Sequence, residues 1–269
     1  MNITQLSANV LTKWVTEGQP FDTHAQLTSA LRLLARWRST VIANTYIARH
    51  GAVIMQGPFA GMKYVESATE GALIPRLIGS YENELHPYFE RLTASGLDCV
   101  IDIGCAEGYY AVGLARLLPD VTVHAYDISR VAQAACRELA NRNDVSGRVI
   151  IGERFEPDGF ESFKGKSCLV MVDTEGAELD ILQPDLSPAL AGMRIIVETH
   201  DMFTKGAMQT LIDRFETTHD IVRVDAKLKA VELPEWFREL APLDHLLATW
   251  EWRSGPTPWL IMEPKTVSA

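Results

Sequence analysis

Two predicted strands in the second half of the chain end in residues that could carry acid–base chemistry. Asp173 and Glu175 stand at the end of the predicted strand 168–173, and Glu198 and His200 at the end of 194–199. In an open α/β sheet, ligands bind beyond the carboxyl ends of the strands, so we expect these side chains to meet there. Histidine can take a proton from a hydroxyl group at neutral pH. We therefore predict His200 as a base, Asp173 as the group that orients it, and Glu175 as a third catalytic residue.

A short turn earlier in the chain has the composition of a ligand-binding loop. The segment 98–103 reads as a strand and 108–118 as a helix, with Gly104, Ala106 and Gly108 between them. A turn without bulky side chains lets the backbone approach a ligand closely, and the start of a helix offers unpaired N–H groups. In a doubly wound sheet, a nucleotide binds at this point. The turn therefore predicts a nucleotide-type cofactor.

Two acids near this turn indicate which cofactor it is. Asp102 would repel a pyrophosphate but suits the ammonium group of an amino-acid moiety. Asp127, after the apolar run 121–126, can accept hydrogen bonds from both ribose hydroxyls. The glycine spacing also departs from the dinucleotide fingerprint, so the sequence favours S-adenosylmethionine over NAD. The predicted cofactor-binding residues are Tyr81, Asp102, Gly104, Cys105, Ala106, Gly108, Asp127, Ile128, Asp173 and, for the adenine edge, Glu153.

The acids near His200 could serve several purposes. They could orient the histidine, balance a sulfonium charge or bind a divalent metal through oxygen. Clustered acids also arise as charges at helix N-termini, which would make Glu175 and Glu178 capping residues, and His200 could be a structural histidine. The sequence therefore predicts S-adenosylmethionine as cofactor and does not favour a metal.

Composition limits the class of protein. The 269 residues are 47% hydrophobic and 22% charged, as in ordinary globular proteins, and carry a net charge of −10. This charge argues against nucleic acid as a partner, and no apolar run or signal peptide indicates a membrane or secretion. We expect a cytoplasmic protein with a small-molecule substrate. The cysteines lack metal-binding spacing and are expected to be buried free thiols: Cys99, Cys105, Cys136 and Cys168.

Alternating strands and helices from residue 98 onward predict an α/β fold with a Rossmann-like, seven-stranded, mostly parallel sheet covered by helices on both faces. Helical patterns over 1–50 and a hairpin over 52–65 predict an N-terminal extension. We expect two domains, 1–92 and 93–269. The extension is predicted to be a homodimer contact or a cap over the site. The expected strands are 98–103, 121–126, 148–152, 168–173, 194–199, 221–225 and 258–263.

Several of these motifs resemble those of class I S-adenosylmethionine-dependent methyltransferases and, more narrowly, of the FkbM-like group. The glycine turn within 101–110 is shared by many methyltransferases, whereas 172–182 and 195–200 carry the narrower match. The resemblance covers about residues 55–205. It implies an antiparallel seventh strand and O-methylation of a hydroxyl on a sugar or natural product.

The sequence thus predicts a methyltransferase acting on a hydroxyl of a small molecule. One alternative is other chemistry with the same cofactor, such as cyclisation or aminocarboxypropyl transfer, because a fold does not determine a reaction. Another is a non-catalytic or NAD-binding Rossmann protein, which Asp102 and the missing glycine disfavour.

Overall fold

A computed structural model describes residues 2–17, 22–66, 71–93, 96–227 and 231–265. The chain divides into two compact units. A helical unit comprises Met1–Gln56, Tyr64–Tyr81 and Lys229–Trp252, and a sheet unit comprises Gly57–Lys63, Glu82–Leu228 and Arg253–Ala269. The expected boundary at residue 92 therefore differs from the division in the structure. The chain passes between the units several times, which a boundary drawn along the sequence cannot represent.

The helical unit contains α1 (Ile3–Thr16), α2 (His24–His50), α3 (Leu73–Leu77), the 3₁₀ helix η3 (Glu235–Glu239) and α9 (Pro242–Thr249). Capping boxes begin both α1 and α2. Arg38 on α2 makes two hydrogen bonds of 2.7 Å with Asp244, which tie α9 to α2. Large apolar residues on α1 and α2 remain exposed, including Leu6, Leu27 and Leu31. The predicted dimer contact through these helices stays a prediction.

The hairpin expected over 52–65 does not form two extended strands. The described residues there contain single bridge residues at Val53 and Lys63 and a turn over 58–61. Gly57 and Gly61 lie at the two ends of this turn, and both have positive φ. The Met55 amide donates instead to the Leu77 carbonyl at 2.8 Å, so the first run bonds outside the expected hairpin. No helix among the described residues has the length and apolarity needed to cross a membrane.

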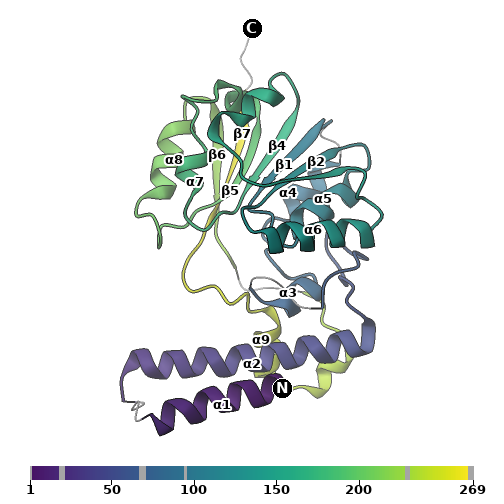
Figure 1. Ribbon diagram of the computed structural model, residues 1–269, viewed down its shortest axis with the longest axis vertical. Helices are drawn as coiled ribbons and strands as arrows, with labels where there is room; N and C mark the ends of the chain where they lie inside the picture. The colour runs from purple at the N-terminus through teal and green to yellow at the C-terminus, as the bar shows by residue number, and fades with distance from the viewer. Residues whose placement is uncertain (1, 18–21, 67–70, 94–95, 228–230, 266–269) are drawn as a thin grey trace. The chain divides into compact units, whose positions relative to one another are not determined.

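The sheet unit contains the predicted seven strands in the order β3-β2-β1-β4-β5-β7-β6 (Figure 1). The first five strands along the chain pair in parallel, whereas β7 is antiparallel to both of its neighbours, β5 and β6. The Rossmann-like fold class and the antiparallel seventh strand are thereby confirmed. The strands are β1 (Cys99–Ile103), β2 (Thr122–Tyr126), β3 (Val149–Gly152), β4 (Cys168–Val172), β5 (Arg194–Glu198), β6 (His219–Val224) and β7 (Trp259–Pro264).

Helices lie between these strands along the chain. Within the sheet unit, α5 packs on β1 and β2, α6 on β3, and α8 on α7 and β6 (Figure 1). Strand residues alternate between the two faces of the sheet. Ile101 and Ile103 join a buried cluster with Phe160 and Phe215, whereas Asp102 points to the other face. The helices are α4 (His86–Leu92), α5 (Tyr109–Leu117), α6 (Arg130–Arg142), η1 (Pro157–Phe163), α7 (Glu178–Ile181), η2 (Pro188–Gly192) and α8 (Ala207–Phe215).

The pairing of β1 with β4 shows that two of the four cysteines are not free thiols, contrary to the expectation from the sequence. Cys99 on β1 lies directly opposite Cys168 on β4, with their Cα atoms 5.0 Å apart, and the two form a disulfide. Their separation of 69 residues concealed this pairing, which depends on which strands are neighbours. Cys105 and Cys136 are free and buried, as expected.

The same register aligns the carboxyl ends of the parallel strands. Ile103 pairs with both Tyr126 and Val172, so the residues that follow these strands meet at one edge of the sheet. Gly104 follows β1 there with φ +86°, and an added Cβ would lie 1.8 Å from the carbonyl oxygen of Asp173. The glycine is therefore needed both for its conformation and for this close approach.

We predict that Gly104→Ala destabilises the protein by at least about 2 kcal/mol, because it combines a left-handed conformation with overpacking. Chemical denaturation monitored by circular dichroism would measure the free energy of unfolding. Gly147→Ala is the matched control, because nothing lies within 4 Å of its added Cβ. Equal stability of the two variants would contradict the assigned role of Gly104.

Candidate functional site

The turn after β1 has the strained backbone of a ligand-binding loop. Gly104, Ala106 and Gly108 all have positive φ, at +86°, +46° and +96°. The amides of Gly104 and Cys105 donate to the carbonyl oxygen of Tyr126 at 2.9 and 3.0 Å, which ties the turn to the end of β2. Ala106 occupies a left-handed conformation that ordinarily favours glycine, and such strain is concentrated at functional sites. The predicted tight turn is therefore present with alanine at its centre.

Asp102 lies beneath this turn and is only 2% exposed. Its Oδ2 atom has no hydrogen-bond partner among the described residues. Burial raises the pKa of its carboxyl group to about 7, a hydrogen bond from the Ala111 backbone opposes the shift, and the charge of Asp127 adds to it. A buried oxygen without a partner is costly, and a cationic ligand would satisfy it. This fits the ammonium group predicted to bind here.

Asp127 follows β2 and lies beside the turn. Its carboxylate accepts hydrogen bonds from the amides of Ala106 at 3.0 Å and Ser129 at 2.7 Å. A carboxylate has further acceptor positions, so Asp127 can still bind ribose hydroxyls. Ile128 is 81% exposed, and Glu153, after β3, is also exposed. These residues line the same sheet edge, as the predicted ribose and adenine contacts require.

Two predicted cofactor residues have other neighbours in the structure. The ring of Tyr81 lies over the guanidinium of Arg76 at 4.3 Å, so its cofactor contact stays a prediction. Cys105 is buried in the turn, where a hydrogen bond with Cys136 and burial raise the pKa of its thiol. Because only the thiolate is strongly nucleophilic, Cys105 is suited to packing and not to nucleophilic catalysis.

The second set of predicted residues forms a buried cluster at the ends of β4 and β5. His200 Nε2 lies 3.3 Å from Glu198 Oε2 and 3.9 Å from Asp173 Oδ1. Its other ring nitrogen, Nδ1, lies 2.6 Å from Glu178 Oε1. The side chains of Glu198 and His200 are 5% and 6% exposed, whereas that of Asp173 is 28% exposed. Asp173 is therefore the member that a substrate can reach.

Charged residues from distant parts of the chain continue this cluster. Arg253 donates hydrogen bonds to Glu198 and, at 2.5 Å, to Glu82, which also accepts a hydrogen bond from the hydroxyl of Tyr110. Positive and negative groups alternate from Glu82 through Arg253, Glu198 and His200 to Glu178. Glu82 has φ +46°, a further strained residue at this site. The predicted residues thus belong to a larger network of buried charges.

This network determines the protonation of its members. Burial lowers the pKa of His200, but hydrogen bonds with Glu178 and Glu198 and the nearby negative charges outweigh it and raise the pKa to about 10. Burial likewise opposes ionisation of Glu198, but His200 and Arg253 lower its pKa to about 2. Burial and the charge of Glu198 raise the pKa of Asp173 well above its usual range. The raised pKa favours the protonated form of His200 at neutral pH, and its predicted role as a base stays a prediction.

Sequence reasoning missed the roles of Glu178, Glu82 and Arg253. A capping role accounts equally well for Glu178 in the sequence, and its carboxylate does accept a hydrogen bond from the Gly176 amide at 2.9 Å, but it also holds His200. Glu82 and Arg253 are 171 positions apart in the chain, so no local pattern relates them. Glu175 is exposed on the loop after β4 with φ +49°, so its catalytic role stays a prediction.

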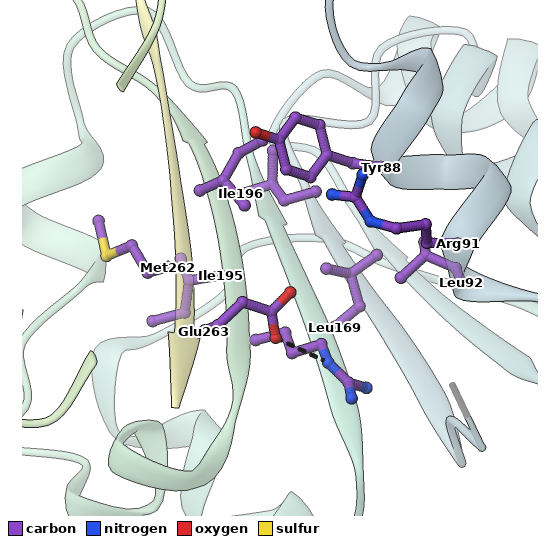
Figure 2. Close-up of a pocket in the computed structure, with 10 residues that line it drawn as sticks. Tyr88, Arg91, Leu92, Leu169, Ile195, Ile196, Met262 and Glu263 are labelled. Carbon is purple, nitrogen blue, oxygen red and sulfur yellow. Dashed lines mark hydrogen bonds and ion pairs between the residues drawn. The ribbon is translucent and has the colours of Figure 1, made fainter. Parts of the chain in front are cut away.

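A cavity of about 140 Å³ lies elsewhere, at the opposite end of the parallel strands (Figure 2). Leu169 and Ile195 line its floor, and Tyr88 and an Arg194–Glu263 pair at 3.0 Å border it. Ligand pockets typically measure about 300 to 1,000 Å³, so this cavity is too small for S-adenosylmethionine. The candidate site is therefore the strand edge and not this cavity.

We predict that His200 carries two ring protons at about pH 8 in the metal-free protein, because two carboxylates stabilise its cation. Nitrogen NMR of the imidazole groups would show this directly. His124 and His219 are internal controls, since burial lowers the pKa of both rings. A neutral His200 ring at that pH would contradict the assigned network, and Glu178→Gln should lower its pKa.

The same shift has a consequence for stability. The folded protein holds the His200 proton more tightly than the unfolded chain, whose histidine has the ordinary pKa of 6.5. The stabilisation is therefore complete below about pH 6.5 and is lost as the pH rises toward about 10.

Comparisons with known proteins agree with this description. The family model of the methyltransferase small domain matches residues 88–167. A release factor glutamine methyltransferase from Synechocystis sp. is 31% identical over 109 residues, covering 38% of this chain and 35% of that protein. One from Chlorobaculum tepidum is 39% identical over 85 residues, covering 30% and 28%. The chain thus spans about a third of the length of these relatives or less.

One similar solved structure is an O-methyltransferase from Bacillus cereus in complex with SAH. It is 12% identical, covers 84% of this chain and 90% of that one, and has a TM-score of 0.47. The narrower FkbM-like resemblance stays a prediction. The segment matched by the methyltransferase family model runs from within α4 to the residue before β4 and so contains the glycine turn, β1, β2 and β3.

Proposed function

We propose that this protein methylates a hydroxyl group of a small molecule with S-adenosylmethionine. The observation that carries the proposal is the alignment of strand ends. It sets the acid-flanked glycine turn directly beside the cluster of Asp173, Glu198 and His200. The first set of residues fits a cofactor with an ammonium group and a ribose, and the second fits an acceptor that must lose a proton.

The cofactor would lie along the carboxyl ends of β1, β2 and β3. Asp102 would accept a hydrogen bond from the ammonium group through its unpaired oxygen. Asp127 would accept from the ribose hydroxyls, and the exposed Ile128 and Glu153 would contact the adenine. Bound in this way, S-adenosylmethionine supplies an electrophilic methyl group on its sulfonium sulfur.

The acceptor would lie against the second cluster. Asp173 would accept the proton that the hydroxyl loses, because it is the partly exposed carboxylate there. His200, held by Glu178, would keep this carboxylate in position, and Glu175 would contact the acceptor from the same loop. The acceptor oxygen bonds to the methyl carbon, the sulfur keeps the electron pair of the broken C–S bond, and S-adenosylhomocysteine remains. Such catalysis depends mainly on positioning the reacting groups.

The relatives favour a second candidate, methylation of a glutamine side chain in a protein. Both matched relatives are named for that activity, but the matches cover only 35% and 28% of their lengths. An amide nitrogen could also donate to the carboxylates of the cluster. Mass spectrometry of candidate proteins and small molecules after incubation with S-adenosylmethionine would distinguish the two acceptors. A methylthioadenosine product would instead indicate cyclisation or aminocarboxypropyl transfer.

We predict that S-adenosylmethionine and S-adenosylhomocysteine bind the purified protein, whereas NADH does not. Asp102→Asn and Asp127→Asn should each weaken binding at least about tenfold, since each loses a charge-assisted hydrogen bond. Isothermal titration calorimetry would measure the affinities. Asp120→Asn is the control, because this exposed carboxylate lies before β2, at the other end of the strand. Binding of NADH, or full affinity in both site variants, would refute the proposed cofactor site.

A further inference from the structure

The three side chains at the acceptor end present ligand atoms that converge on one point. One atom each from Asp173, Glu198 and His200 lies within 4.8 Å of the others. His200 Nε2 is 3.3 Å from Glu198 Oε2 and 3.9 Å from Asp173 Oδ1. Neighbouring ligand atoms around an ion with bonds of about 2.1 Å lie about 3 Å apart, and opposite ones about 4.2 Å. Both distances from His200 Nε2 fall within this range.

Glu198 and His200, the two deeply buried residues of the three, are also held by hydrogen bonds of the kind that usually orient metal ligands. A ligating histidine commonly donates its other ring nitrogen to a carboxylate, and ligating carboxylates are hydrogen-bonded in turn. His200 Nδ1 is bound to Glu178, whose carboxylate is fully buried, so Nε2 is directed at the other two acids. Arg253 binds Glu198 through Oε1, which leaves Oε2 facing His200. The outer contacts therefore orient the ligand atoms toward one another.

Charge points to a cation at the same place. Four carboxylates belong to this network within the described residues, those of Glu82, Asp173, Glu178 and Glu198, and they outnumber the two basic side chains that bind them there, Arg253 and His200. Glu178 Oε2 is buried without a hydrogen-bond partner in the part of the chain that the structure describes. Buried charges are costly unless they are paired. A bound divalent ion would offset this excess of negative charge.

We propose that Asp173, Glu198 and His200 bind a divalent cation of the Mn²⁺ type, which holds the acceptor oxygen. This inference rests on the proposed function for the identity of the acceptor but not for the metal site itself. Two carboxylates and one imidazole suit a first-row divalent ion, since carboxylates favour Mn²⁺ and Mg²⁺ and imidazole favours transition metals. The histidine ligates once its Nε2 proton is lost to solvent, as is general for such sites.

The cation has a clear task in the proposed reaction. Three protein ligands would leave other coordination positions of the ion to water or a substrate oxygen. There it would stabilise the negative charge that develops as the hydroxyl loses its proton. Asp173 would use Oδ1 for the ion and keep its second oxygen for that proton. The acceptor class is then an oxygen compound that can reach the exposed side of Asp173.

Binding of Mn²⁺ alone tests this site. The full-length protein, treated with EDTA and dialysed, would be titrated with MnCl₂ while the signal of free Mn²⁺ is followed by electron paramagnetic resonance. We expect one site, and pulsed measurements should detect coupling to a single imidazole nitrogen. Asp173→Asn should weaken binding at least about tenfold, since it replaces a charged ligand oxygen with a neutral one. Asp180→Asn is the matched control, an exposed carboxylate on the neighbouring helix.

The outcomes separate this inference from the proposed function. Absence of stoichiometric Mn²⁺ binding, loss of affinity in both variants alike, or bound Mn²⁺ without nitrogen coupling would each overturn the metal site. Calorimetry with S-adenosylmethionine on the same samples reports independently on the cofactor site. Mn²⁺ binding without S-adenosylmethionine binding would uphold the metal site and refute the proposed function. S-adenosylmethionine binding without Mn²⁺ binding would support the proposed cofactor site and overturn the metal site.

Discussion

The hydrogen bond between His200 and Glu178 is the interaction on which the candidate site depends. Nδ1 lies 2.6 Å from a carboxylate that is fully buried, so the imidazole has one orientation. Removing one partner of a buried ion pair leaves an uncompensated charge and typically costs about 3 to 5 kcal/mol. The fold tolerates these charges because their signs alternate through Glu198, Arg253 and Glu82. The chain segments that contribute them are thereby fixed relative to one another within the sheet unit.

The candidate site also depends on the register of the parallel strands. The ends of β1, β2 and β4 coincide because Ile103 pairs with both Tyr126 and Val172. Every strand-end residue of interest therefore falls on one edge of the sheet. Arg253 and Thr257 precede β7 in the chain, and Arg253 donates a hydrogen bond to the Thr257 hydroxyl. The antiparallel strand β7 then leads away from this edge.

Much of this arrangement could be predicted from sequence for a definite physical reason. The strands are short runs of β-branched and other apolar residues separated by helical patterns, and this alternation is local information. It locates Asp102, Asp127 and Asp173 at strand ends without any knowledge of the fold. The glycine turn is equally local, because steric limits on φ act within single residues.

The remainder depends on which distant segments meet. The disulfide between Cys99 and Cys168, the pairing of Glu82 with Arg253 and the assignment of residues 229–252 to the helical unit all require the folded chain. The protonation of His200 belongs to the same class. Its ordinary pKa suits a base, and only the folded chain brings the carboxylates that raise this pKa.

The contact between Gly104 and Asp173 connects the glycine turn to the cluster of Asp173, Glu198 and His200. The glycine backbone lies so close to the Asp173 carbonyl that no methyl group fits between them. The Asp173 amide also donates to the Ile103 carbonyl at 3.0 Å. Tightly packed groups transmit displacement instead of absorbing it. A ligand that shifts the glycine turn must therefore move Asp173 as well. If both proposed subsites bind their ligands, occupancy of one would then change the affinity of the other, and by thermodynamic linkage the effect would be equal in both directions.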